Sequence, residues 1–97
     1  MDYTLIIDPR AIQDIQKAID YYDEQQPGLG LRFEDVVNKK LVALKKSPFF
    51  QIRYDNVRCL PLKKFPYMVH FTINEQKNNI TIHAVFHTSL DPINWNR

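Results

Sequence analysis

Glycine, cysteine and serine are scarce in this 97-residue sequence, and each scarcity excludes a kind of chemistry. Gly28 and Gly30 are its only glycines, so no glycine-rich loop can cradle phosphates, which argues against P-loop NTPases and dinucleotide-binding enzymes. Cys59 is alone and can form neither an internal disulfide nor a multi-cysteine zinc site. Ser47 and Ser89 lack the context of a nucleophile elbow. We therefore expect no cofactor and no serine or cysteine nucleophile.

Long apolar runs are also absent. No window approaches the ~18 uninterrupted apolar residues of a membrane span, and the N-terminus lacks the basic-then-apolar profile of a signal peptide. The chain is 44% hydrophobic and 25% charged, as ordinary globular proteins are. Its length suits one hydrophobic core, because two cores would each be too small. We expect a single domain over residues 1–97, located in the cytoplasm and without membrane contact.

Hydrophobic periodicity predicts a short strand followed by two helices. Residues 3–7 are a strand-like run that ends at Asp8 and Pro9, where Asp can cap free N–H groups and Pro tolerates the first helical position. Pro27 and Gly28 end the first helix, and a second helix ends near Ser47 and Pro48, so we expect an antiparallel hairpin. The apolar face of the first helix is Ala11, Ile12, Ile15, Ala18, Ile19 and Tyr22, its polar face is Asp14, Lys17, Asp20, Asp23 and Glu24, and the second helix has Phe33, Val37, Leu41 and Leu44.

Three further strands are predicted after the second helix, over residues 57–62, 67–73 and 80–86. The last two alternate apolar and polar residues, and the polar segment 74–79 between them suits a hairpin turn. The order is β-α-α-β-β-β. We therefore predict an α+β fold in which the helical hairpin covers one face of a mainly antiparallel, four-stranded sheet.

The last hairpin also predicts where the histidines lie. If Ile73 pairs with Ile80, regular alternation places His70 opposite His83, puts Met68 opposite Val85, and leaves His87 on the same uncovered face. His83 and His87 are then roughly 13 Å apart along one strand, too far to share an ion, and no nearby carboxylate completes a site around His70. We expect no metal, and we expect His87 to be available to a partner.

Charge is divided along the chain. The first 35 residues carry three basic and eight acidic side chains, a net of −5, whereas residues 36–64 carry eight basic and one acidic, a net of +7. Lysines on the back of a helix are often solvated and idle, but a basic surface can also meet phosphate or an acidic protein. The basic residues are Lys39, Lys40, Lys45, Lys46, Arg53, Arg58, Lys63 and Lys64.

The remaining enzymatic possibility is general acid–base cleavage of RNA. It needs groups to activate the 2′-OH, to protonate the leaving oxygen and to hold the phosphate charge. Such side chains occur by chance in any basic domain, so the residues favour binding of an anionic or acidic surface over RNA cleavage. Those of a suitable type are Arg58, Lys63, Lys64, Tyr67, His70, His87 and Arg97.

The order of several short strings resembles a known family. The strings are Pro27-Gly28-Leu29-Gly30-Leu31-Arg32-Phe33, Val57-Arg58, Lys64-Phe65-Pro66-Tyr67, Ile82-His83-Ala84-Val85-Phe86-His87, and Asp91-Pro92 with Trp95 and Arg97. Together they resemble the RelE/ParE superfamily of toxins from bacterial type II toxin–antitoxin modules, in particular the ParE-like plasmid-stabilisation branch. The resemblance implies a compact toxin that a cognate antitoxin wraps and blocks.

The resemblance also implies two modes of action. RelE-like members cleave mRNA on the ribosome, whereas ParE-like members inhibit DNA gyrase. Met68 stands where nuclease-type members typically have an arginine, and His87 matches a histidine common in ParE-like sequences. We therefore expect a ParE-like toxin that binds gyrase. The alternatives are a RelE-like ribonuclease, whose catalytic candidates are Arg58, Tyr67 and His87, and a toxin fold that has lost activity.

The same resemblance implies a functional surface. The resemblance carries over Arg58, Tyr67, His87 and Arg97 as this surface, although the tail after Trp95 that holds Arg97 is short. The target-binding candidates are Arg58, Lys63, Lys64, His87 and Arg97.

Overall fold

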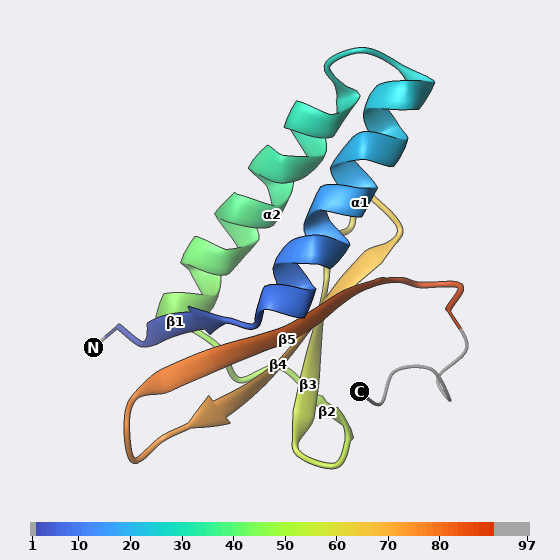
Figure 1. Cartoon of the computed structure of the whole chain (residues 1–97). Coiled ribbons are helices and arrows are strands. Elements are labelled where there is room, and N and C mark those ends of the chain that lie inside the picture. Colours follow the sequence, from blue (N-terminus) through green and yellow to red (C-terminus); the bar gives the residue numbers. More distant parts are fainter. Residues whose placement is uncertain (1, 91–97) are drawn as a thin grey trace.

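Two helices cover one face of a five-stranded sheet (Figure 1). The computed structural model describes residues 2–90. The elements are β1 (Thr4–Ile7), α1 (Pro9–Gln25), α2 (Leu29–Lys46), β2 (Ile52–Tyr54), β3 (Val57–Pro61), β4 (Tyr67–Asn74) and β5 (Asn79–His87). The strand order is β1-β5-β4-β3-β2, with β1 parallel to β5 and the other neighbours antiparallel. The predicted α+β architecture is confirmed, and within residues 2–90 no helix is long and apolar enough to cross a membrane.

The sheet has one strand more than the sequence predicts. The additional strand is β2, which pairs with β3 through Ile52 and Arg58, and through Tyr54 and Val57, with an irregularity between the two pairs. Ile52 is exposed and Tyr54 only partly buried, since this three-residue strand lies at the edge of the sheet. A strand this short, without a buried face, has no periodicity that a sequence pattern could reveal.

Asp8 caps the start of α1 as predicted. Its Oδ1 accepts the backbone N–H of Arg10 at 2.8 Å, and its carboxylate also pairs with the Arg10 guanidinium, with Oδ2 at 2.9 Å from Nη2. These two interactions with Arg10, the side-chain one being the larger, lower the pKa of Asp8 from 3.8 to about 2. The charged carboxylate is therefore favoured in the folded state.

This pKa shift predicts a pH dependence of stability. Because the pKa of Asp8 is lower in the folded chain, its ionised form stabilises the fold above pH 3.8, and this stabilisation disappears as pH falls towards 2. Asp8→Asn keeps a capping oxygen but has no charge. Urea unfolding should show Asp8→Asn to be less stable than the wild type at pH 5 and equal to it near pH 2. A difference that stays constant over this range would contradict the assignment.

The buried side of α1 differs from the prediction at two residues. Ala11 and Ala18 are its buried residues, seven positions apart on one stripe. Ile12, which the prediction placed in the core, is 53% exposed because it lies about 100° around the helix from Ala11. Asp14, predicted to face solvent, lies between the two alanines, and its Oδ2 accepts the backbone N–H of Val85 in β5 at 3.1 Å. The Asp14 carboxylate thus joins α1 directly to the sheet.

The register of the β4–β5 hairpin contains a bulge. Ile73 pairs with Ile80 as predicted, but His70 pairs with Ala84 because the register shifts by one residue between His70 and Phe71. The predicted pairing of His70 with His83 is therefore wrong, as is that of Met68 with Val85. An extra residue in one strand leaves two residues opposite one and shifts the alternation of every residue beyond it.

The bulge decides on which face His87 lies. The helix-facing side of the sheet includes Val69 and Val85, which pair with each other and belong to the buried core. Two residues further, Tyr67 pairs with His87 on that same face. The expectation that all three histidines share the uncovered face is thus wrong for His87. The core itself is formed by Ala11, Ala18, Phe33, Val37, Leu41, Leu44, Leu60, Leu62, Val69, Phe71, Ile80, Ile82 and Val85.

Candidate functional site

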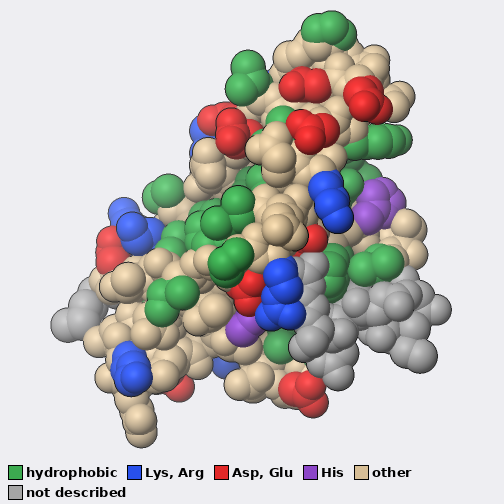
Figure 2. Space-filling view, viewed as in Figure 1, with side chains coloured by type: hydrophobic (Ala, Val, Ile, Leu, Met, Phe, Trp, Pro, Cys, Tyr) green, Lys and Arg blue, Asp and Glu red, His purple; other side chains and the backbone are tan. Residues whose placement is uncertain are grey.

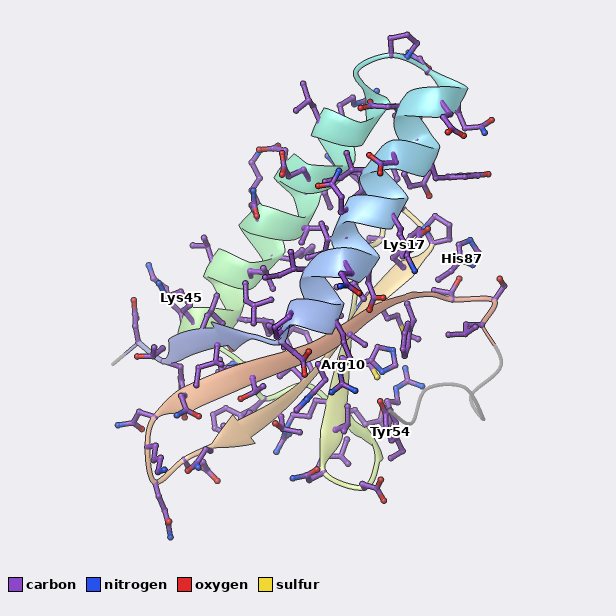
Figure 3. All side chains as sticks on the ribbon, in the orientation of Figure 1. Arg10, Lys17, Lys45, Tyr54 and His87 are labelled. Carbon is purple, nitrogen blue, oxygen red and sulfur yellow. The ribbon has the colours of Figure 1, made fainter. Side chains whose placement is uncertain are left out.

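His87 lies at the exposed end of β5, on the same side of the molecule as Lys17 of α1 (Figure 3). Its Nδ1 accepts the backbone N–H of Ser89 at 3.0 Å and is 2.7 Å from the Ser89 hydroxyl oxygen. In the neutral ring the proton is therefore on Nε2. The ring also contacts that of Tyr67 edge-on, with 5.2 Å between centroids. One of the catalytic candidates of the ribonuclease alternative is thus exposed and fixed in orientation by its neighbours.

Tyr67, another of these candidates, belongs to an aromatic cluster under the helical hairpin. Its ring centroid is 6.1 Å from that of Tyr22 and 5.1 Å from that of Phe33. Burial raises the pKa of the Tyr67 hydroxyl, and the nearby Tyr21 raises it further. Tyr67 therefore keeps its proton at neutral pH, which makes it a poor general base.

Arg58 lies at a distance from this pair. It pairs with Phe71 in β4, whereas His87 pairs with Tyr67, so the two positions are four residues apart along β4. That spacing is about 13 Å along a strand. The Arg58 guanidinium donates from Nη1 to the carbonyl of Phe50 at 2.7 Å and stacks over the ring of Phe49 at 5.4 Å. Arg58 thus holds the segment after α2 against the sheet.

Lys63 and Lys64 occupy a tight turn between β3 and β4. The Lys64 N–H donates to the carbonyl of Leu62 at 2.8 Å, and Lys63 between them has φ of +69°. A three-residue turn with positive φ at its centre is the rarer, strained kind of γ-turn, and glycine adopts that backbone conformation most easily. Lysine stands there instead. The strained backbone places two consecutive ammonium groups on the outside of the turn.

The strain at Lys63 predicts that glycine is better for stability there. A left-handed backbone costs an L-residue roughly 1–2 kcal/mol, part of which the greater freedom of glycine in the unfolded chain offsets. Lys63→Gly should therefore raise the free energy of unfolding by up to about 1 kcal/mol, as measured by urea denaturation. Lys64→Gly, at a position without positive φ, should not raise it. Lower stability of Lys63→Gly would contradict the strain.

The two lysines face α2 across a groove with two adjoining cavities of about 680 and 350 Å³. Val36 and Lys64 line both cavities, so the depression is continuous. We call it the α2 groove, and its lining consists of Leu29, Leu31, Arg32, Asp35, Val36, Lys39, Lys40, Ala43, Leu62, Lys63, Lys64 and Phe65. In the view of Figure 2, by contrast, acidic side chains gather over the outer part of the helical hairpin and Lys and Arg are scattered.

The structure therefore divides the predicted site residues among three places. Lys63 and Lys64 line the α2 groove, His87 lies at the end of β5, and Arg58 is bound to the segment after α2. Arg97 lies outside the described residues. The groove also recruits Lys39 and Lys40, whose role the sequence left open between solvated surface and binding surface. The sequence does contain a pattern that could have identified these two lysines. The helix α2 has a face on which residues recur every three or four positions, namely Arg32, Val36, Lys39, Lys40 and Ala43.

A polar cluster, separate from the α2 groove, lies on the sheet face opposite the helices. His70 is fully buried there, with Nδ1 at 3.0 Å from the Tyr54 hydroxyl oxygen and 3.6 Å from Sγ of Cys59. Burial raises the pKa of the Cys59 thiol to about 11, so the thiol stays protonated and unreactive. His83, on the same face, has Nε2 at 2.8 Å from Oγ1 of Thr72. Within residues 2–90 no group of three His, Cys, Asp or Glu side chains is arranged to hold a metal ion.

The fold and the sequence together define a toxin of the type II toxin–antitoxin class. The family model of the ParE toxin of the type II toxin–antitoxin system, parDE, matches residues 5–92, and the chain belongs to this family. It is the toxin component of such a module. No curated protein sequence matches the chain significantly.

Solved structures share the fold at low sequence identity. A chain of the chromosomal ParDE system from P. aeruginosa superposes with a TM-score of 0.80 at 17% identity, covering 90% of this chain and 97% of that one. The isolated E. coli RelE toxin gives 0.63 at 19%, covering 95% and 90%. A chain of the intact E. coli RelBE toxin–antitoxin complex gives 0.63 at 21%, covering 88% and 95%. Both the ParE and the RelE branches are thus represented among its structural neighbours.

Proposed function

We propose that this toxin acts by binding a protein target, DNA gyrase, and that a cognate antitoxin neutralises it. The observation that carries the proposal is the separation of Arg58 from Tyr67 and His87 by about 13 Å along β4. RNA cleavage needs a phosphate-binding cation and an acid–base pair around one phosphodiester. The separation of these groups supports an action through binding. If the target is gyrase, the toxin acts in the cytoplasm, where gyrase works.

Other observations at the same residues support this proposal. The Arg58 guanidinium is already engaged by the Phe50 carbonyl and the Phe49 ring, and Met68 provides no cation beside Tyr67. The pKa of Tyr67 is raised rather than lowered. The relationship to ParDE and RelBE structures supports an antitoxin partner.

Two assays on the purified protein test the proposal. We expect inhibition of gyrase supercoiling, and we expect intact mRNA in a translation extract analysed by primer extension. Cleaved mRNA with normal supercoiling would overturn it in favour of a ribonuclease.

The ribonuclease alternative rests on one observation, the exposed His87 ring whose Nε2 carries the proton in its neutral form. His87→Ala is the variant for this alternative. If the toxin is a ribonuclease, the wild type should cleave mRNA and His87→Ala should not. If it acts by binding, neither the wild type nor His87→Ala should cleave mRNA. Absence of growth arrest on expression without the neighbouring antitoxin gene would instead indicate a toxin fold without activity.

A further inference from the structure

We propose that the α2 groove is the surface through which this toxin engages gyrase, and that its occupant is an acidic segment of the target protein. The inference rests on the proposed function and adds the location and chemistry of the contact. The expected segment carries one apolar side chain, which inserts into the smaller cavity, flanked by at least two carboxylates. Three features of the groove carry this inference: its charge, its floor and its strained rim.

The charge of the groove is almost all of one sign. Among the lining residues that lie in the described part of the chain, five are basic and one is acidic, a net charge of +4. The acidic residue is Asp35, whose carboxylate is 3.0 Å from the ammonium of Lys39, both well exposed. Such an exposed pair is weak and is easily exchanged for a carboxylate of a partner. The basic residues are Arg32, Lys39, Lys40, Lys63 and Lys64.

The floor of the groove is apolar, which favours a protein over a nucleic acid. Leu62 is fully buried at its base, and Val36 and Ala43 of α2 form its wall. The cavity of about 350 Å³ above them lies within the size range of pockets that receive apolar groups. A sugar–phosphate backbone would use the lysines but would leave this apolar surface uncovered. A protein segment with an apolar side chain and carboxylates around it would contact both the lysines and the apolar floor.

The rim supplies an independent indication of function. Lys63 holds a positive φ in a γ-turn, although glycine would adopt that backbone conformation with less strain. Strained backbone conformations cluster at functional sites, where the surrounding structure maintains them. Here the strain fixes Lys63 and Lys64 at the edge of the groove, facing the lysines of α2.

The groove suits reversible binding of a target better than lasting neutralisation by an antitoxin. Exposed cations around a small apolar floor give rapid, salt-sensitive association, whereas permanent complexes bury larger and more apolar interfaces. Most large exposed apolar side chains lie outside the groove, at Phe49, Phe50 and Ile52 and at Ile6 and Ile12, whereas Leu31, 68% exposed, lines its larger cavity. We therefore assign the groove to the target.

Charge-reversal variants of the toxin test the basic residues on both sides of the groove. Lys39→Glu with Lys40→Glu, and separately Lys63→Glu with Lys64→Glu, should each weaken binding to the purified gyrase tetramer at least tenfold by surface plasmon resonance. Inhibition of supercoiling should fall in parallel. The matched control is Lys45→Glu with Lys46→Glu, the same charge change on the same helix but outside the lining residues, with Lys45 near β1 (Figure 3). It should change binding less than threefold.

A second pair of variants tests the apolar floor without changing charge. Ala43 lines the groove and is itself exposed, so Ala43→Trp can fill the cavity without disturbing the core. It should weaken gyrase binding at least fivefold. Val42→Trp adds the same ring at the neighbouring position, which is 60% exposed and does not line the groove. It should bind as the wild type does, and circular dichroism should show both variants to be folded.

The outcomes separate this inference from the proposed function. A wild-type protein that does not inhibit gyrase refutes both. Inhibition by the wild type together with full potency of the groove variants overturns the inference and leaves the function intact. Variants that lose binding to a short DNA duplex but still bind gyrase overturn it in favour of a nucleic acid. Variants that still inhibit gyrase but escape the antitoxin encoded beside the toxin overturn it in favour of the antitoxin.

Discussion

Replacing Gly30 with alanine is expected to destabilise the fold by about 2–3 kcal/mol, as overpacking in a close contact does. Gly30 is buried where α2 meets α1, and a Cβ at this position would lie 2.5 Å from the carbonyl oxygen of Ile19 and 2.7 Å from Cγ of Asp23. The first of these atoms belongs to the backbone of α1 and cannot rotate away. The helices must therefore separate, which also strains the 2.7 Å bond from the Gly30 N–H to the Asp23 carboxylate.

Gly28→Ala is the matched control for Gly30→Ala. A Cβ at Gly28 meets nothing within 4 Å, so its cost is confined to the positive φ of +89°, about 1 kcal/mol or slightly more. Urea denaturation of both variants measures the difference directly. Equal losses for the two glycines would mean that backbone conformation, and not the close approach of the helices, explains the requirement at Gly30.

Truncating Phe33 to alanine is expected to be more damaging, with a loss of about 3–5 kcal/mol of unfolding free energy. Phe33 is fully buried, and its ring centroid lies 5.1–5.5 Å from those of Tyr22, Phe65 and Tyr67. Loss of the ring would remove the contacts that join the helical hairpin to Phe65 and Tyr67, which follow the Lys63 turn. Because small domains have only about 5–15 kcal/mol of stability, a large part of it would be lost.

Phe50→Ala is the comparison for Phe33→Ala. Phe50 is 38% exposed, and its ring centroid lies 6.5 Å from that of Phe71, so its truncation should cost about 1 kcal/mol or less. Thermal and urea unfolding of both variants give the two values. A loss below about 1.5 kcal/mol for Phe33→Ala would show that the aromatic cluster does not organise this end of the fold.

The helices were predictable from the sequence because burial imposes a repeat of three and four residues on each of them. The bulge in β5 was not predictable, because Ala84 and Phe86 continue the alternation of Ile80 and Ile82 without a visible break. His87 was therefore assigned to the wrong face. The alternation of apolar and polar residues reveals a bulge only where it is interrupted. When apolar side chains occur on both faces of the strand, an extra residue leaves no such interruption.

The α2 groove shows a different limit. Lys39 and Lys63 are 24 positions apart in the chain, and no local pattern relates one to the other. Their proximity depends on where the turn between β3 and β4 meets α2, which is a property of tertiary packing. Each basic residue was visible in the sequence, whereas the apolar floor that turns them into a binding surface was not.

The bond from the Val85 N–H to Asp14 has a consequence for self-association. The last pair between β1 and β5 is that of Ile7 with Ile82, and within residues 2–90 no strand lies beside this edge of β5 beyond that pair. The backbone N–H groups of an edge strand can serve as a template for a strand of another chain, and hence for aggregation. By accepting the Val85 N–H, the Asp14 carboxylate occupies one of these positions from within the molecule. The same side chain that fixes α1 on the sheet thus makes this edge less available to a second copy of the toxin.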